Sequence, residues 1–242
     1  MTRVNGSRAI DRNLYGAVAA AFAVIVFAGF ARTYYLKTLF GLPPLPSIVV
    51  HAHGMVMTAW VMLFFTQVRL IAGHRVRLHQ RLGYASIGLA ALMVTIGVWT
   101  ALRAARFGSA STPPGFSEPT FSIVPLGDIL LFTLFYSAAI FFRRQPARHK
   151  RFMYLTFVNF LPPAVGRLPL GFVAAHPVLF GLGVPAVLSL GMLAFDTWRH
   201  KKADWVFAGA VVIFLASFPI RIALVNTAGW TAVATWLASF AG

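Results

Sequence analysis

The sequence predicts an all-α integral membrane bundle of seven transmembrane helices, and three observations support this prediction. Hydrophobic residues make up 59% of the 242 residues. Charged residues make up only 11%, whereas soluble domains carry about 25%. Apolar runs close to the roughly 20 residues that a helix needs to cross a bilayer recur along the chain. A soluble core could not enclose so many apolar side chains, so we expect lipid to be the solvent.

Polar and proline-rich segments separate the predicted spans, which cover about residues 14–36, 48–72, 78–103, 121–142, 149–170, 177–198 and 204–225. The first is interpreted as a permanent span rather than a signal peptide, because its apolar run is long and no small-residue cleavage site follows. Pro162 and Pro163 are expected to kink the fifth span. The tail is too short for an eighth span, and its aromatic residues favour a C-terminal helix along the membrane interface.

Basic residues set the predicted orientation. The formal net charge is +16, and most of the 21 Lys and Arg residues fall in segments that face the cytoplasm if the N-terminus does. The six exceptions are Arg32, Lys37, Arg103, Arg106, Arg167 and Arg221. Cytoplasmic loops of membrane proteins carry such an excess, so we predict a cytoplasmic N-terminus and an outer C-terminus. Charge in short turns between spans favours the lipid bilayer as partner and argues against nucleic acid. With no internal repeat, residues 1–242 are expected to form one domain.

Several familiar chemistries have no residues to perform them. The chain has no cysteine, which excludes disulfides, thiolate metal sites and thiol catalysis. It contains no phosphate-binding P-loop, no dinucleotide fingerprint, no H-E-x-x-H zinc motif and no nucleophilic serine elbow. No predicted helix carries the paired carboxylates of a di-iron site.

Two predicted helices carry a polar stripe along one face. At about 100° per residue, side chains seven apart lie on the same face of a helix. The second span has this spacing in His53, Trp60 and Gln67, and the third in His79, Ser86, Met93 and Thr100. His51 points about 200° away from His53, so His53 is the one expected to face inward. Polar stripes need a partner other than lipid, which places both faces in the interior.

Histidines open four of the predicted spans. His79 and His149 begin two spans at the cytoplasmic face, and His53 and His176 begin two at the outer face. Neutral imidazoles on neighbouring helices can ligate haem iron or another metal. The alternative, which the sequence leaves open, is that these histidines lie among lipid headgroups or cap their helices. Arginines that could bind haem propionates surround the inner pair: Arg75, Arg77, Arg81, Arg148 and Arg151.

Asp128 is an acidic residue within the fourth predicted span. A buried carboxylate is costly without a partner, and Arg167, expected in the same outer leaflet on the next span, is its predicted partner. Together with Arg32, Trp60 and Gln67, the pair would form an outward-facing pocket for an anionic or carbonyl-bearing ligand. The alternative for Arg32 is that its guanidinium extends to the headgroups.

Several short motifs together resemble an uncharacterised family of bacterial seven-helix inner-membrane proteins. They are ARTYYL (31–36), HG (53–54) with Trp60 and Gln67, HQRLG (79–83), Asp128, RR with HKRFM (143–153), GRLP (166–169), and FDTW with Asp196. The resemblance covers nearly the whole chain and implies a multi-pass protein of the bacterial inner membrane, without an activity. A more distant similarity to transmembrane b-type cytochromes implies haem b.

Three classes of function agree with these residues. The first is a haem- or metal-binding redox protein that uses His79 and His149, with His53 and His176 as a second site. The second is a carrier or ligand-binding module with the outer-leaflet pocket around Asp128 and Arg167. The third is an accessory or assembly subunit whose polar stripes contact another membrane protein.

Overall fold

The structure is a computed structural model that describes residues 2–45, 47–109, 112 and 115–241, with side chains from residue 13 onward. Over these residues it is helical, without a strand. Six helices are long and apolar enough to cross a membrane: Asn13–Tyr35, Ile48–Ala72, Val76–Phe107, Glu118–Arg144, Pro177–His200 and Trp205–Leu224. The predicted class, an all-helical multi-pass membrane protein, is therefore confirmed.

The helices match six of the predicted spans to within a few residues, apart from the extension of α1 and α3 at their ends. In chain order they are α1 (Thr2–Phe30), the π-helical turn η1 (Ala31–Tyr35), the 3-10 turn η2 (Lys37–Phe40), α2 (Ile48–Ala72), α3 (Val76–Phe107), α4 (Glu118–Phe121), α5 (Ile123–Phe141), η3 (Phe142–Arg144), α6 (Pro146–Val158), α7 (Pro162–Val165), α8 (Gly171–Ala175), α9 (Pro177–His200), α10 (Trp205–Leu224) and α11 (Ala228–Ser239).

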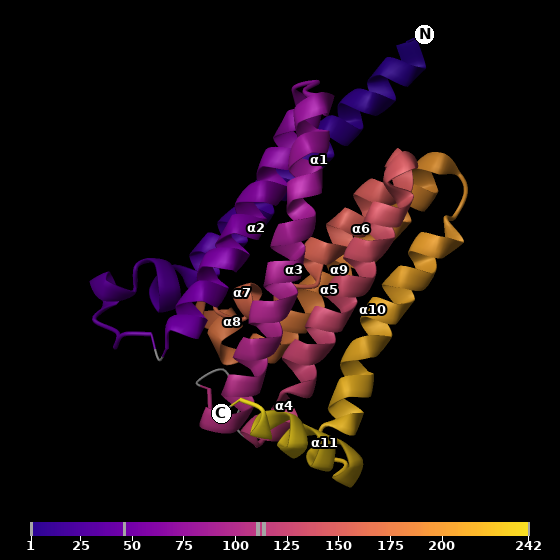
Figure 1. Ribbon diagram of the computed structural model, residues 1–242. Coiled ribbons are helices and arrows are strands. Elements are labelled where there is room, and N and C mark those ends of the chain that lie inside the picture. Colours follow the sequence, from indigo (N-terminus) through magenta and orange to yellow (C-terminus); the bar gives the residue numbers. More distant parts are fainter. Residues whose placement is uncertain (1, 46, 110–111, 113–114, 242) are drawn as a thin grey trace.

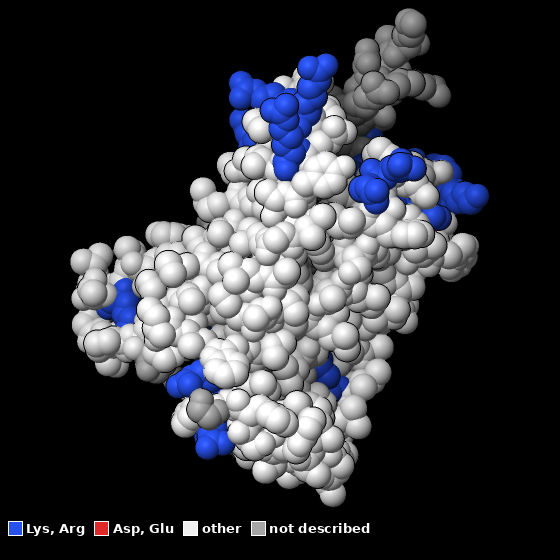
Figure 2. Space-filling view, viewed as in Figure 1, with Lys and Arg blue, Asp and Glu red and all other residues white. Residues whose placement is uncertain are grey.

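The long helices pack side by side as one bundle (Figure 1). The turns that join α2 to α3, α5 to α6 and α9 to α10 lie at one end, and α4 and α11 lie at the other. Lys and Arg gather at the first end (Figure 2). We call it the basic end and define it by the three turns at residues 73–75, 142–145 and 201–204.

Aromatic side chains fill the core where α1, α2 and α6 meet. Phe22 of α1 stacks on Phe157 of α6 with ring centroids 4.6 Å apart, and Phe64 of α2 lies 4.9 Å from Phe157. All three are buried. Lipid tails are as apolar as these rings, so close packing rather than escape from water holds the helices together here.

The fifth predicted span, residues 149–170, is wrong as one kinked helix. α6 ends at Val158, and after a short turn α7 covers only Pro162–Val165. Pro162 and Pro163 occupy the first turn of α7, where a missing N–H costs no hydrogen bond. Inside a continuous helix the same two residues would remove two successive hydrogen bonds and clash with the preceding turn. The helix therefore ends and restarts.

The broken segment still runs antiparallel along the length of α9. Near the basic end Arg151 of α6 pairs with Asp196 of α9. At the other end a Cβ on Gly166 would lie 3.3 Å from the carbonyl oxygen of Pro177, the first residue of α9. α6 and α7 together therefore traverse the same depth of the bundle as a helix that is long enough to span.

The tail forms a helix, α11, as the sequence predicts. It packs across the ends of α3 and α4, where the Trp230 indole N–H donates to the carbonyl oxygen of Thr120 at 2.7 Å. Arg106 of α3 donates to the carbonyl oxygen of Ser239 at 3.4 Å. These contacts fix the C-terminal helix to the end of the bundle opposite the basic end.

The crossing of α1 over α7 generates a prediction about Gly29. A Cβ on Gly29 would lie 2.1 Å from the carbonyl oxygen of Ala164, which is fully buried, so the two backbones would have to separate. We expect Gly29→Ala to lower the free energy of unfolding by about 1–3 kcal/mol, measured by thermal unfolding in detergent. Gly209→Ala is the control, because a Cβ there meets nothing within 4 Å. Equal stability of the two variants would contradict the close approach.

Candidate functional site

The structure brings His79 and His149 together at the basic end. Each lies in the first turn of its helix, His79 in α3 and His149 in α6, where Pro146 starts the helix. Their ring centroids are 6.3 Å apart and the ring planes are inclined by 83°. Both side chains are half-buried. The sequence predicted these two histidines as a pair, although it gave no distance between their helices.

Hydrogen bonding orients the two rings differently. His149 Nδ1 lies 2.8 Å from the carbonyl oxygen of Ala139. A carbonyl oxygen can only accept, so Nδ1 carries the hydrogen and Nε2 of the neutral ring is left with its lone pair. His79 Nδ1 is buried and has no hydrogen-bond partner among the described residues. The pair therefore offers ring nitrogens that the protein itself does not use.

Gln67 of α2 supports the start of α3. Its side-chain amide donates to the carbonyl oxygen of His79 at 3.2 Å, while its Oε1 is buried without a partner in the described structure. A Cβ on Gly83, one turn beyond His79, would be 3.9 Å from the same amide nitrogen. The polar stripe of the second predicted span thus meets the stripe of the third.

A second polar contact continues from this point into the bundle. Ser86 donates to the carbonyl oxygen of Gly83 at 2.6 Å, so the hydroxyl of Tyr136, 2.7 Å away, donates to Ser86. Trp60 packs edge-on to the Tyr136 ring, and its buried indole N–H has no acceptor among the described residues. We call this set the polar column; it comprises His79, His149, Gln67, Ser86, Tyr136 and Trp60. Sequence reasoning missed Tyr136, whose signal is a hydroxyl in the middle of an apolar helix.

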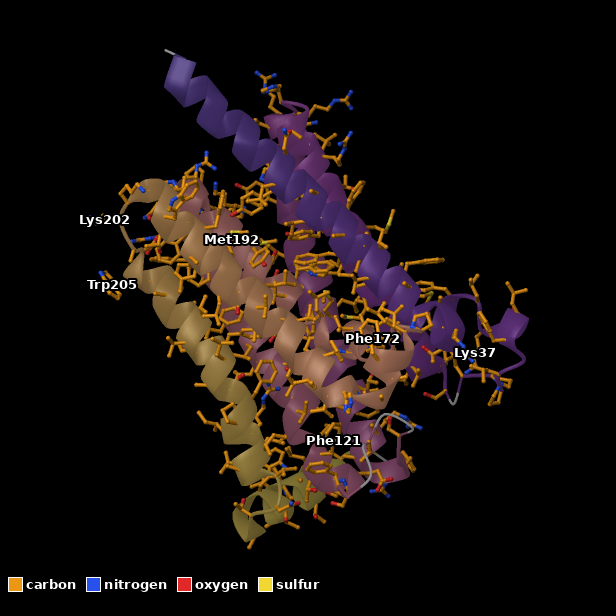
Figure 3. The ribbon with its side chains drawn as sticks, turned by 180° about the vertical axis from the view of Figure 1, so that it is seen from behind. Lys37, Phe121, Phe172, Met192, Lys202 and Trp205 are labelled. Carbon is orange, nitrogen blue, oxygen red and sulfur yellow. The ribbon has the colours of Figure 1, made fainter. Side chains whose placement is uncertain are left out.

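Two arginines of the basic end are neutralised by aspartates. Arg151 donates to Asp196 at 2.6 and 3.0 Å and to Asp204 at 2.7 Å, and Arg148 donates to Asp204 at 3.1 Å. Asp204 also caps α10 by accepting from the backbone N–H of Val206. Lys202 and Trp205 mark this turn in Figure 3. Arg148 and Arg151, expected as partners for haem propionates, are therefore occupied within the protein.

The pKa of Asp204 reflects two opposed effects. Its partial burial raises the pKa, but hydrogen bonds from Arg148 and from the backbone of Phe207, with the charges of Arg148 and Arg151, outweigh burial. The net pKa lies below the ordinary value, so the carboxylate is charged at neutral pH. The carboxylate therefore joins α6 to α10 as an ion pair.

Asp128 is buried, but its predicted partner is wrong. Arg221 of α10 donates to the Asp128 carboxylate at 2.6 Å and to the carbonyl oxygen of Val124 at 2.7 Å. Gly127 makes room for it, because a Cβ there would lie 2.5 Å from the Arg221 side chain. Arg167 instead donates to the carbonyl oxygen of Pro163 and lies over the Phe30 ring. The next segment in sequence, α6, does pack on α5, but the chain turns after Val158 and carries Arg167 to Phe30 of α1. α10, which also packs on α5, brings Arg221 to the carboxylate instead.

The other predicted site residues lie apart. Arg32 is exposed and stacks on the Phe40 ring, and His176 is exposed at the residue before α9. His53 is half-buried whereas His51 is exposed, the order that the stripe predicts. No ring contact joins His53 to His176, both of which are described. The outer pair of histidines and the outer pocket are therefore not assembled as the inner pair is.

Two hollows open at the surface of the basic end. One, of about 500 Å³, lies between α1 and α2 and is lined by Asn13, Gly16, Ala17, Arg69, Ala72 and Gly73. The other, of about 380 Å³, lies on the far side of Arg69 and is lined by Phe65, Thr66, Arg69, Leu70, Gly73 and Arg75. None of the predicted histidine ligands or pocket residues lines either hollow, although Arg75, expected near the haem propionates, lines the smaller one.

The Asp128–Arg221 contact generates a prediction that distinguishes it from the sequence-based pairing. Removing one partner of a buried ion pair leaves an unpaired charge, so Arg221→Gln should lower the free energy of unfolding by about 3–5 kcal/mol. Asp128→Asn should lower the free energy of unfolding much less in the Arg221→Gln background than in the natural protein. The double-mutant cycle should therefore give a coupling of about 0.5–3 kcal/mol. The control cycle combines Asp128→Asn with Arg167→Gln, which should be additive. Coupling in the control cycle alone would restore the original pairing.

Comparisons with protein-family models, with curated proteins and with solved structures find no match to this chain. The function must therefore be inferred from the chain's own residues.

Proposed function

We propose that the chain crosses the cytoplasmic membrane of a bacterium seven times, with its N-terminus inside. The path of α6 and α7 along α9 supports a seventh passage, because α9 is itself long enough to span. The gathering of Lys and Arg at the basic end supports the orientation. The resemblance of the motifs to a family of bacterial inner-membrane proteins supports this location, and membership of that family is part of the proposal.

Single-cysteine labelling tests the seventh passage, and the natural chain is a suitable background because it has no cysteine. Cysteines at Gln145 and Lys202, in two turns of the basic end, should react only from the cytoplasmic side. A cysteine at Ala174, exposed in α8, should react only from outside. Labelling of Ala174→Cys from the cytoplasmic side would show that α6 to α8 turn back without crossing.

We propose that the protein binds haem, or failing that a bare transition-metal ion, between His79 and His149 and transfers electrons at the membrane surface. The observation that carries this proposal is the spacing of the two rings. An imidazole nitrogen lies about 2.0–2.1 Å from a bound metal, so two rings on opposite sides of one metal have centroids about 6 Å apart. The ring centroids of His79 and His149 are 6.3 Å apart.

The hydrogen bond of His149 supports the same assignment. Metal-bound histidines almost always donate their other ring N–H to a carboxylate, a backbone carbonyl or water, which fixes the tautomer and the ring orientation. The carbonyl oxygen of Ala139 serves this purpose for His149. Gln67 holds the backbone at His79, and the Ser86–Tyr136 hydrogen bond is buried further along the bundle.

The number of ligands favours haem over a bare ion. Among the described residues no group of three or more His, Cys, Asp or Glu is close enough to hold a metal. A zinc site takes three or four protein ligands, whereas haem brings four nitrogens of its own and takes one or two axial ligands. Haem iron supplies a one-electron couple. Arg77 and Arg81, exposed on the α3 turns around His79, are available for the propionates, since Arg148 and Arg151 are paired with aspartates.

The carrier hypothesis has less support. It needs Asp128, Arg167, Arg32, Trp60 and Gln67 to surround one ligand. Trp60 and Gln67 belong to the polar column, and Arg32 is exposed on η1. The accessory-subunit hypothesis has less support, because Gln67 and Ser86 of the polar stripes contact α3 and α5 inside the bundle rather than an outer surface.

The absorbance spectrum and the metal content of the purified protein test the redox proposal. We expect Soret and α bands in the reduced-minus-oxidised spectrum, and loss of both in His79→Ala and His149→Ala. His51→Ala, at an exposed histidine outside the polar column, is the control and should keep the bands. A wild-type protein without bands and without bound iron or copper, or bands that survive in His149→Ala, would refute the proposal.

A further inference from the structure

Ion pairs compensate part of the positive charge on one side of the basic end. Arg148 and Arg151, on α6, are joined to Asp204 and Asp196. The arginines around the α2–α3 turn have no such partner: no ion pair joins them to an acid whose side chain is described. They are Arg69, Arg75, Arg77 and Arg81, and all four are exposed. This turn therefore presents uncompensated positive charge at the membrane boundary.

Arg69 differs from the other three because it stands between two hollows. Both hollows described above include Arg69 and Gly73 in their walls, and no acidic residue is among the described residues that line them. Four of the six residues around the larger hollow are glycine or alanine. The space exists because α1 and the end of α2 have no side chains there to fill it.

The walls combine Arg69, joined by Arg75 in the smaller hollow, with apolar surface. Beside Arg69 the larger hollow offers Ala17 and Ala72, and the smaller offers Phe65 and Leu70. The larger opens between α1 and α2, and the smaller lies along the end of α2 and the turn after it. Both are at the basic end, where the proposed orientation places the lipid headgroups. The planar guanidinium of arginine matches the oxygens of a phosphate in a bidentate manner. A phosphate carried on acyl chains complements both the charge and the apolar walls, whereas a free phosphate complements only the charge.

We propose that an anionic phospholipid binds at these hollows, with its headgroup phosphate on Arg69, its glycerol region in the space beside Gly16, and its chains along α1 and α2. Arg75, at the edge of the smaller hollow, adds a second positive charge near the same headgroup. Basic pockets between transmembrane helices on the cytoplasmic side are suited to such lipids. The site is independent of the proposed metal site, which lies between α3 and α6.

The test reconstitutes the full chain in nanodiscs that contain phosphatidylcholine with or without phosphatidylglycerol and counts bound lipids by native mass spectrometry. Phosphatidylglycerol should be enriched on the wild-type protein. The contribution of one Arg to binding at an anionic surface predicts that Arg69→Gln lowers this enrichment about fivefold. Gly16→Leu, which fills the hollow without changing the charge, should lower it as well. A Cβ on Gly16 meets nothing within 4 Å, so this variant is expected to fold.

Arg144→Gln is the matched control, because it removes an equal charge from the basic end but lines neither hollow. It should leave the enrichment almost unchanged. An equal loss in Arg144→Gln and Arg69→Gln would show attraction by surface charge alone and overturn the site, as would an unchanged enrichment in Gly16→Leu. Inorganic phosphate is added to the phosphatidylglycerol nanodiscs as a further arm. Displacement of the lipid by millimolar phosphate would identify a site for a soluble anion instead.

Discussion

Lipid offers no partner to a polar group, and this constraint accounts for the placement of three of the five acidic residues. Asp128 joins α5 to α10 through Arg221, while Asp196 and Asp204 join α9 and α10 to α6 through Arg151 and Arg148. α10 is therefore held by an ion pair near each of its ends. Since one unpaired member of such a contact is strongly destabilising, these bonds favour one arrangement of the helices over others.

The first half of the bundle is held together differently. α1, α2 and α3 contribute no described acidic side chain, and they pack through the aromatic cluster of Phe22, Phe64 and Phe157 and through small residues. Gly54, for example, lets the Tyr34 ring approach α2, since a Cβ there would lie 2.4 Å from that ring. The arginines around the α2–α3 turn form no ion pair with a described acidic side chain. The same division explains why ion pairs hold part of the charge on one side of the basic end, whereas the arginines of the α2–α3 turn are left to attract anions.

The sequence predicted the class of fold and most of the helix ends, because bilayer thickness sets the length of apolar runs and basic turns separate them. It also predicted the interior face of α2 and α3, since side chains seven apart share a face: Trp60, Ser86 and Met93 are buried. Two features could not be obtained in this way. Hydropathy does not distinguish a kinked span from a broken one, and depth in the membrane does not identify neighbours. Asp128 and Arg167 were matched by depth and by the adjacency of their spans in the sequence, whereas Arg221 reaches the carboxylate because α10 packs beside α5 and Gly127 leaves space.

The two candidate ligands of the polar column lie on opposite sides of this division. His149 is on α6, where Pro146 starts the helix and Arg148 and Arg151 are held by aspartates; its ring is fixed by Ala139. His79 is on α3, whose turn has no ion pair among the described residues, and its backbone rests on one amide of Gln67. A group that enters between the rings would thus meet one ligand already oriented and one that can adjust. Binding would then hold the start of α3 against α6. The α2–α3 side of the basic end, which has no ion pair among the described residues, would thereby gain an internal contact through the bound group.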